Sequence, residues 1–370
     1  MADKVRIGII GCGGIANSKH LLALGALKDR ADLVGFCDII PERARKAAAE
    51  YGVPDAKVYT DYKELLKDDT IEAVHVLTPN RWHREMTVNA LEAGKHVMCE
   101  KPMAINPAEA MEMVNAAKRT GKLLAIGYQY RQRNDSLALK RLADEGALGD
   151  IYYAKGHAVR FRGVPTWGVF TNKFEQGGGP LIDIGTHALD LALWVMDNYK
   201  PRMVLGSVFN YLGTSLKPGE QGNRMGVWDP DTYEVEDSAF GMVKMENGAS
   251  IYLEAAWALN INDIREGMIT VCGTKSGATM VPVDGDNGWR TDKQLILSSV
   301  VADTPAETRP KVSPVKPGQG PHDKECINWL NAIQTGSPLL VQPEQAYTVT
   351  RILDGIYQSN REGKAVTFSE

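Results

Sequence analysis

The spacing of hydrophobic and polar positions changes once along the chain, near Gly149. Before that point, continuous apolar runs such as VRIGII and DLVGFCD alternate with segments whose apolar residues recur every three or four positions. Continuous runs are typical of strands buried on both faces, and the second pattern is typical of helices. This alternation predicts a parallel, doubly wound α/β sheet.

The expected elements of this first region follow from the runs and their boundary residues. Pro41 stands in the first turn of one expected helix, Gly52 follows its end, and Asp61 is placed to cap the next. The pattern predicts strands at 5–10, 32–38, 73–79, 96–102 and 123–129, and helices at 14–28, 41–52, 61–68, 81–93 and 107–119.

Beyond Gly149 the runs are longer and lack intervening helices, which predicts a second, α+β domain with a largely antiparallel sheet. Asn247-Gly248 is a hairpin signal between two of these runs. Residues 283–321 are rich in Pro, Gly and Asp, and we expect an irregular segment there, followed by helices at 323–335 and 343–362. We therefore expect a doubly wound domain over 1–130 and an α+β domain over 131–370, whose C-terminal helices are able to pack back on the first.

Composition narrows the class of protein. A length of 370 residues favours two domains, and a net charge of −4 gives no electrostatic signature for nucleic acid or an anionic membrane. No apolar run approaches the roughly 20 residues of a membrane span, and the N-terminal decapeptide has charges where a signal peptide is apolar. The five cysteines are widely spaced and form no CxxC pair, so we expect buried thiols in a reducing cytoplasm.

A dinucleotide-binding motif follows the first predicted strand. Gly11 allows the tight turn, Gly13 lets the backbone approach a pyrophosphate, and Ala16 stands at the third position, where helix packs on strand. Asp38 ends the second strand, where a carboxylate binds the ribose hydroxyls and repels a 2′-phosphate; Ile39 follows, with no basic residue directly beyond. We expect NAD rather than NADP, the alternative for Asp38 being a cap of the next helix.

Two later strand ends, 77–83 and 99–102, face the same edge of the predicted sheet. Pro102 disfavours helix at Lys101 and aims its side chain over the crevice. A lysine there stabilises negative charge on a substrate oxygen. The alternative is a surface pair of Glu100 and Lys101, which contributes little.

The segment 175–194, EQGGGPLIDIGTHALDLALW, places two carboxylates and an imidazole in an apolar helix. Asp183 and His187 are four residues apart and share a helix face near its start. An imidazole titrates near neutral pH and takes the proton of a hydroxyl, while a carboxylate orients the substrate. The alternatives are a capping Asp with a core His, or a metal pair, for which no third ligand is evident. Asp190 either orients His187 or lies at a solvated or interface position.

Two further stretches are candidates for substrate recognition. Tyr130 and Arg131 follow the last predicted Rossmann strand. Residues 157–171 mix His157, Arg162 and Trp167, and aromatic rings beside hydrogen-bonding groups suit a carbohydrate. Ordinary core or strand-end roles are the alternative.

Three stretches, GCGGIA, EKP at 100–102 and GGGPLIDIGTHALD at 177–190, make the chain resemble the Gfo/Idh/MocA family of NAD(P)-dependent oxidoreductases. The resemblance implies a Rossmann domain and an open-faced sheet that often packs against another subunit, hence a homo-oligomer, a dimer or tetramer. It implies catalytic roles for Lys101, Asp183 and His187. The expected cofactor contacts are Gly11, Gly13, Gly14, Ile15, Asp38, Ile39, Thr78, Asn80, His83, Glu100, Lys101 and Gln129. The expected substrate contacts are Tyr130, Arg131, His157, Arg162, Trp167, Asp183 and His187.

The family's activity is transfer of a hydride between a sugar, glycoside or polyol and the nicotinamide of NAD. The stretch RGVPTWG at 162–168 looks like members that act on glucosides, which implies oxidation of a 3-hydroxyl to a 3-keto sugar. Three alternatives stay open: a glycosidase that oxidises C3 transiently with retained NAD, an inositol dehydrogenase, and a sensor that binds NAD(H) without turnover.

Overall fold

The fold was examined in a computed structural model, which describes residues 3–283 and 293–368. The chain divides into two units, the first made of Met1–Gln132 and Lys316–Tyr347 and the second of Arg133–Val315 and Thr348–Glu370. The segment Lys316–Tyr347 thus returns to the unit that begins the chain.

The first unit contains a six-stranded sheet in the order β3-β2-β1-β4-β5-β6, with every neighbouring pair parallel. The predicted doubly wound sheet is confirmed, and this strand order places a ligand crevice beyond the carboxyl ends of β1 and β4. The strands are β1 (Val5–Ile10), β2 (Ala31–Cys37), β3 (Lys57–Tyr59), β4 (Ala73–Val76), β5 (His96–Cys99) and β6 (Leu124–Ile126).

The helices of this unit begin and end largely where local signals place them. Asp61 caps α3 by accepting a hydrogen bond from the Lys63 backbone, and Asn106 caps α5 in the same way from Glu109. The expected helix at 14–28 begins where predicted, contains a π-helical turn (Ala16–His20) before the five-residue α1, and ends earlier, at Gly25. The helices are α1 (Leu21–Gly25), α2 (Pro41–Tyr51), α3 (Tyr62–Leu66), α4 (His83–Glu92), α5 (Pro107–Thr120) and α10 (Pro321–Thr335).

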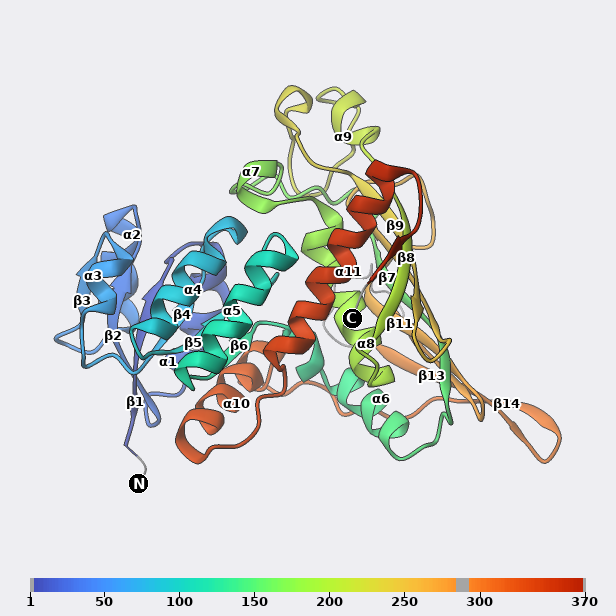
Figure 1. Cartoon of the computed structure of the whole chain (residues 1–370), viewed down its shortest axis with the longest axis horizontal. Helices are drawn as coiled ribbons and strands as arrows, with labels where there is room; N and C mark the ends of the chain where they lie inside the picture. The colour runs from blue at the N-terminus through green and yellow to red at the C-terminus, as the bar shows by residue number, and fades with distance from the viewer. Residues whose placement is uncertain (1–2, 284–292, 369–370) are drawn as a thin grey trace. The chain divides into compact units, whose positions relative to one another are not determined.

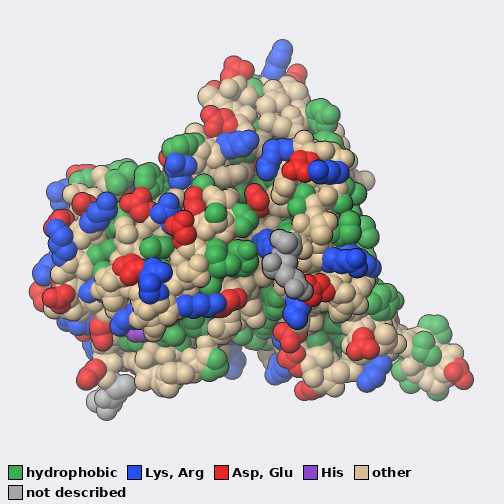
Figure 2. All heavy atoms as spheres, in the orientation of Figure 1, with side chains coloured by type: hydrophobic (Ala, Val, Ile, Leu, Met, Phe, Trp, Pro, Cys, Tyr) green, Lys and Arg blue, Asp and Glu red, His purple; other side chains and the backbone are tan. Residues whose placement is uncertain are grey.

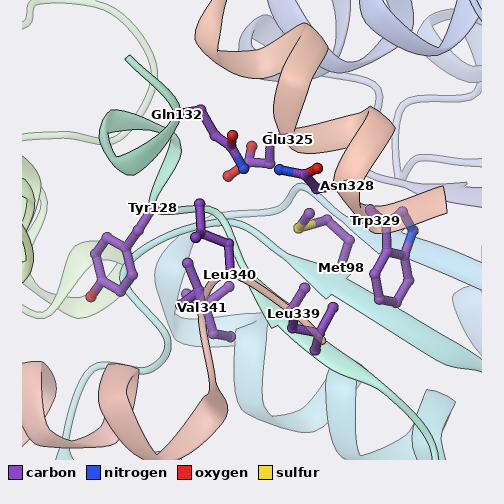
Figure 3. Close-up of a pocket in the computed structure, with 11 residues that line it drawn as sticks. Met98, Tyr128, Gln132, Glu325, Asn328, Trp329, Leu339, Leu340 and Val341 are labelled. Carbon is purple, nitrogen blue, oxygen red and sulfur yellow. The ribbon is translucent and has the colours of Figure 1, made fainter. Parts of the chain in front are cut away.

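The core of the first unit includes α10, which comes from the far end of the sequence. Cys326, Trp329 and Leu330 of α10 are buried in one cluster with Ile7 and Ile9 of β1. A cavity of about 20 Å³ remains between α10, β5 and β6 (Figure 3). That volume holds about one water molecule, so the cavity is not a binding site for a nucleotide or a sugar.

The second unit contains a nine-stranded sheet in the order β14-β13-β12-β11-β7-β10-β9-β8-β15. All neighbouring pairs are antiparallel except β7 with β10, so the expected largely antiparallel sheet is confirmed. The strands are β7 (Ile151–Val159), β8 (Pro201–Phe209), β9 (Ser238–Met245), β10 (Ser250–Ala256), β11 (Arg265–Gly273), β12 (Gly277–Val281), β13 (Gln294–Val301), β14 (Thr304–Thr308) and β15 (Val366–Thr367).

Helices cover one face of this sheet (Figure 1). Gly156 of β7 lies against Ala188 of α8, and Gly206 of β8 and Gly241 of β9 both lie against Ile356 of α11. A Cβ at any of these glycines would meet the helix at 3.3 Å or less, so they let α8 and α11 approach closely. The helices are α6 (Asn134–Asp144), α7 (Lys173–Gln176), α8 (Thr186–Met196), α9 (Leu212–Ser215) and α11 (Pro343–Glu362, from Thr348 onward in this unit).

The predicted irregular segment at 283–321 is wrong in part, because β13 and β14 form a hairpin at the edge of the sheet. Their turn places Ala302 and Asp303 at φ 49° and 58°, without the Gly or Asn that usually signals such a turn. The turn therefore carries only a weak local signal, Asp303. Residues 284–292 of the same prediction lie outside the described residues.

The surface agrees with the small net charge. On the face drawn in Figure 2, acidic and basic side chains are intermingled rather than gathered into a field of one sign. Within the described ranges, no helix combines the length and the apolar character needed to span a bilayer.

Candidate active site

The loop after β1 has the geometry that a dinucleotide requires. Gly11 adopts φ +94°, and a Cβ there would lie 2.6 Å from the carbonyl oxygen of Leu77. At Gly13 and Gly14, by contrast, a Cβ would meet no atom within 4 Å. Gly11 is thus needed by the fold itself, whereas Gly13 and Gly14 leave open space beside the backbone for a ligand to approach.

Asp38 directly follows β2 and is mostly buried. Its Oδ2 accepts a hydrogen bond from the Cys12 backbone (2.8 Å) and its Oδ1 accepts one from the Ile40 backbone (2.9 Å). The carboxylate therefore ties the glycine loop to the end of β2. Each oxygen has a second lone pair for a ribose hydroxyl, which keeps the predicted cofactor role compatible with this geometry.

Two predicted cofactor residues present buried oxygens without a hydrogen-bond partner in the described structure, Thr78 Oγ1 and Gln129 Oε1. Buried polar atoms in folded proteins are normally hydrogen-bonded. Together with the open glycine backbone, these two oxygens fit a polar ligand such as NAD. Ile39 is 86% exposed, as expected for a side chain beside the adenosine end of the crevice.

We expect Gly11→Ala and Gly13→Ala to separate folding from cofactor binding. Alanine at Gly11 is strained by roughly 1–2 kcal/mol through its positive φ and also meets the Leu77 carbonyl. This variant should lower the melting temperature and weaken NAD binding. Gly13→Ala should keep the melting temperature and weaken only NAD binding, as measured by calorimetry. Equal effects of both variants on stability would contradict the assignment.

His83 and Glu100 are bound by the chain itself. The His83 ring is fully buried, with Nδ1 2.7 Å from the Pro102 carbonyl oxygen and Nε2 2.9 Å from that of Thr78. The Glu100 carboxylate lies 2.7 Å from His20 and accepts a hydrogen bond from the Lys101 backbone. The surface-pair alternative for Glu100 and Lys101 is therefore wrong, because Glu100 is only 6% exposed.

Lys101 stands in the turn after β5, between Glu100 and Pro102, and is half-buried. The peptide bond from Lys101 to Pro102 is cis. Since β5 adjoins β4 in the parallel sheet, the turn that holds Lys101 leaves the same edge as the glycine loop. That is the edge at which a nicotinamide is expected.

Asp183 and His187 occupy two kinds of helix. Asp183 lies in a π-helical turn, Leu181–Gly185, that leads directly into α8, where His187 is 4% exposed. The sequence analysis assumed one regular α-helix, and the π-helical turn is a correction to it. Asp190 is fully buried, so the solvated alternative for this residue is wrong.

Glu236 is a residue that the sequence analysis missed. It accepts hydrogen bonds from the Gly179 backbone (2.8 Å), the Leu181 backbone (3.1 Å) and the Tyr357 hydroxyl (2.7 Å). Burial raises the pKa of Glu236, and the three donors offset part of that effect. Glu236 thus holds the start of the helix that carries Asp183, from a position 53 residues farther along the chain (236 − 183).

Trp257 is the second missed residue, and it contacts Asp183 directly. Its ring is fully buried and its Nε1 donates a hydrogen bond to Asp183 Oδ2 at 3.1 Å. Phe170 lies edge-on to Trp257 with ring centroids 6.2 Å apart, and Trp167 lies edge-on to Phe170 at 5.9 Å. Trp167 is 56% exposed, so a row of three aromatic rings runs from the surface of the second unit to Asp183.

The other predicted substrate residues differ in their surroundings. Arg162 donates to Asn260 and stacks on Phe161 beside the aromatic row, and Tyr130 is half-buried. Arg131 is fully buried and donates to the Leu340 carbonyl and to Gln345 of its own unit, a structural tie.

His157 lies on the sheet face opposite α8. Its neighbour Gly156 faces α8, and successive side chains of a strand point to opposite faces. The His157 ring lies 2.8 Å from Glu254 and 3.2 Å from Thr270, both on neighbouring strands. We therefore do not include His157 or Arg131 among the substrate contacts of the proposed function.

Both units match one protein family. Residues 5–128 match the NAD-binding Rossmann fold of the Gfo/Idh/MocA oxidoreductases, and residues 140–368 match the C-terminal alpha/beta domain of the same family. The chain belongs to the Gfo/Idh/MocA oxidoreductase family. The resemblance noted in the sequence is confirmed, and with it the assignment as an NAD-dependent oxidoreductase.

Named members of this family resemble the chain to different extents. It is 36% identical to D-glucoside 3-dehydrogenase of Escherichia coli K12, over 99% of this chain and 98% of the relative. It is 31% identical to inositol 2-dehydrogenase of Salmonella typhimurium LT2, over 58% of this chain and 61% of the relative. The solved structure of levoglucosan dehydrogenase in complex with NADH and levoglucosan has a TM-score of 0.81 at 23% identity, covering all of both chains.

Membership of the Gfo/Idh/MocA family explains the arrangement of the first unit. The glycine loop, Asp38 and Thr78 lie within the match with an NAD-binding Rossmann fold, and Gln129 directly follows its last residue, 128. The open backbone at Gly13 and the unpaired buried oxygens of Thr78 and Gln129 are compatible with NAD at this edge of the sheet.

Proposed function

We propose that the protein oxidises the 3-hydroxyl of a glucoside to a 3-keto sugar with NAD as the acceptor. The observation that carries this proposal is the full-length similarity to D-glucoside 3-dehydrogenase of Escherichia coli, at 36% identity. The aromatic row that leads from the exposed Trp167 to Asp183 supports it, because an aromatic ring stacks on the apolar face of a pyranose.

Each candidate catalytic residue has a chemical task in this reaction. His187 takes the proton of the reacting hydroxyl, because an imidazole nitrogen is able to act as a general base. Asp183, held by Trp257, accepts a hydrogen bond from a neighbouring hydroxyl and fixes the orientation of the ring. Lys101 stabilises the negative charge that develops on the reacting oxygen.

The reaction balances without a further reactant. The C3 hydroxyl loses its proton to the protein, C3 loses a hydride, and the carbon–oxygen single bond becomes a carbonyl. The nicotinamide ring supplies the hydride acceptor, which is the cofactor's own chemistry. The protein then releases its proton to water.

The test is NADH formation from NAD and a panel of methyl β-D-glucoside, glucose, glucose 6-phosphate and myo-inositol. The proposal predicts the highest kcat/KM with the glucoside and a 3-keto product in the same amount as NADH. Preference for myo-inositol would favour an inositol dehydrogenase. Glycoside cleavage without net NADH would favour the transient-oxidation glycosidase, and binding without turnover would favour a sensor.

We expect Trp167→Ala to raise the KM for methyl β-D-glucoside about tenfold, since an aromatic contact contributes roughly 0.5–1.5 kcal/mol. The melting temperature should stay unchanged because the ring is 56% exposed. Tyr152→Ala is the matched control, as Tyr152 is similarly exposed at 57% and is not one of the three rings of the row. Equal KM values for wild type and Trp167→Ala would remove Trp167 from the substrate site.

We further propose that the protein is a cytoplasmic homo-oligomer that associates through the sheet face opposite α8 and α11. Leu205 of β8 and Met242 of β9 are register partners on this sheet and are 53% and 54% exposed. Exposed apolar side chains gathered in this way are typical of protein interfaces. Light scattering on the purified protein tests the proposal, and a monomer at micromolar concentration would contradict it.

The proposed cytoplasmic location is supported by the cysteines, four of which are buried and free, as expected in a reducing compartment.

A further inference from the structure

The turn that carries Lys101 is surrounded by buried histidines for which the proposed reaction has no use. His20 and His75 are fully buried and linked to Glu100, on the N-terminal side of Lys101, and His83 is fully buried near Pro102, on its C-terminal side. All three belong to the first unit and come from different elements: the π-helical turn before α1, the strand β4 and the start of α4. Burying an imidazole is costly unless its nitrogens find partners, so this grouping calls for an explanation.

On the first side, three side chains form a hydrogen-bonded chain that ends at the turn. His75 Nδ1 lies 3.2 Å from His20 Nδ1, and His20 Nε2 lies 2.7 Å from Glu100 Oε1. The other oxygen of Glu100 accepts a hydrogen bond from the Lys101 backbone at 3.1 Å. The chain therefore runs from β4 to the backbone nitrogen of Lys101.

The hydrogen-bond partners settle where the protons lie. An ionised carboxylate only accepts hydrogen bonds, so His20 Nε2 carries a proton and donates it to Glu100. Burial lowers the pKa of His75 well below its usual value, so this ring is neutral and has one N–H. Placing that N–H on Nδ1 lets it donate to His20 and leaves His75 Nε2, which has no partner among the described residues, as a bare acceptor. The opposite choice would bury an unpaired N–H, which is the rarer case.

On the second side, the His83 ring lies between the turn and the loop after β4. Its ring nitrogens lie 2.7 Å from the Pro102 carbonyl oxygen and 2.9 Å from the Thr78 carbonyl oxygen. Burial lowers the pKa of His83, so the neutral ring has one N–H and donates to one of these two carbonyl oxygens. Lys101 is thus flanked by two residues, Glu100 and Pro102, that are each held by a buried histidine. A lysine that must meet a reacting oxygen benefits from such a rigid support.

We infer that His75, His20 and His83 are positioning residues that hold the turn of Lys101 in its working geometry, with Glu100 as the link. The inference rests on the proposed role of Lys101 in catalysis. The buried histidines then support the reaction without touching the substrate.

The negative charge of Glu100 depends on the hydrogen bond that it accepts from His20. Burial alone would raise the pKa of Glu100, but the hydrogen bond from His20 and the neighbouring positive charges outweigh it and lower the pKa to about 2. Without the His20 donor, a contribution that keeps the pKa of Glu100 low is lost, so this pKa should rise. The titratable groups that act on Glu100 in the described part of this unit are His20, His83, Cys99, Lys101, His322, Glu325 and Cys326.

The variants His20→Leu and His20→Gln test the inference. Leucine removes the donor, whereas the Gln amide places an N–H near the position of Nε2. We expect His20→Leu to lower kcat 10- to 100-fold at pH 7, since a displacement of about 1 Å costs up to about 10²-fold. The acid limb of its kcat–pH profile should move to higher pH, and His20→Gln should restore most of kcat and the wild-type profile. A loss of melting temperature with an unchanged profile would overturn the inference.

Two controls keep the result interpretable. His96, like His75, packs on Trp329, but its ring accepts a hydrogen bond from the Leu123 backbone instead of joining the chain to Glu100. His96→Leu should therefore leave the kcat–pH profile unchanged. If His20→Leu does not fold, ¹⁵N NMR of the wild-type rings decides: the inference requires the Nδ1–H form of His75 and the Nε2–H form of His20. An Nε2–H form of His75 would contradict it. Full activity of Lys101→Met would instead refute the proposed catalytic role, whatever the histidines do.

Discussion

Replacing Lys101 with methionine is expected to lower kcat with methyl β-D-glucoside about 10³-fold, within the range of about 10²–10⁴ that a positioned catalytic group contributes. Methionine keeps the apolar stem of the side chain and removes its charge. NAD binding should persist, because the glycine loop and the Asp38 carboxylate belong to other parts of the crevice. Steady-state kinetics and calorimetric titration with NAD on the same protein measure the two effects.

The matched control is Lys118→Met. Lys118 lies on α5 of the same unit, is exposed, and forms a surface ion pair with Glu344. Such pairs contribute little, so kcat should stay at the wild-type value. A Lys101→Met variant with wild-type kcat would exclude Lys101 from catalysis.

The second large effect concerns stability and comes from Glu325. This glutamate is 6% exposed beside the cavity of Figure 3, where it gathers with Gln132 and Asn328, and its Oε2 has no partner among the described residues. Burial, and then the charge of Glu100, raise the pKa of Glu325 well above its usual value. The folded protein therefore keeps Glu325 protonated over a pH range in which the unfolded chain has released the proton.

The coupling between proton binding and folding sets the direction in which stability changes with pH. The stability that the raised pKa provides is fully present below about pH 4.5, the ordinary value for Glu, and is lost as the pH rises toward the folded-state pKa. Over that window wild type loses about 1.4 kcal/mol of unfolding free energy per pH unit relative to Glu325→Gln, which cannot ionise. Urea denaturation of both proteins at pH 5, 6 and 7 should show an advantage for Glu325→Gln that grows with pH.

Glu344→Gln is the control, and its effect on stability should depend on pH in the opposite direction. Partial burial raises the pKa of Glu344, but the hydrogen bond from Lys118 outweighs it and the net pKa is lowered. Its contribution is present above the ordinary pKa and is lost on acidification, so Glu344→Gln should be slightly less stable than wild type at pH 7. A stability difference for Glu325→Gln that does not vary with pH would contradict the burial of an uncharged Glu325.

Features that depend on neighbouring residues in the sequence were predictable. The continuous apolar runs of β1 and β2 predicted a parallel sheet, Asp61 predicted the start of α3, and Asn247-Gly248 predicted the turn between β9 and β10. The tight turn at Gly11 was also predictable, since the motif requires a backbone conformation that other residues rarely adopt. In each case the physical cause acts within a few residues.

Features that depend on distant partners were not predictable from one sequence. Trp257 donates to Asp183 across 74 positions, and His20 meets Glu100 across 80. Nothing in the spacing of these residues indicates which of many buried polar groups will pair. His157 shows the same limit: its place in an aromatic stretch suggested a substrate contact, whereas its contacts with Glu254 and Thr270 come from neighbouring strands.

The most direct test of the central claim follows the hydride itself. Methyl β-D-glucoside deuterated at C3 is incubated with the protein and NAD, and the reduced cofactor is analysed by mass spectrometry. The account predicts one deuterium in the reduced nicotinamide and a slower reaction than with the unlabelled sugar, while substrates deuterated at C1 or C2 give unlabelled NADH. Deuterium retained in the sugar, or transferred from another carbon, would contradict the assignment of the protein as a glucoside 3-oxidising enzyme.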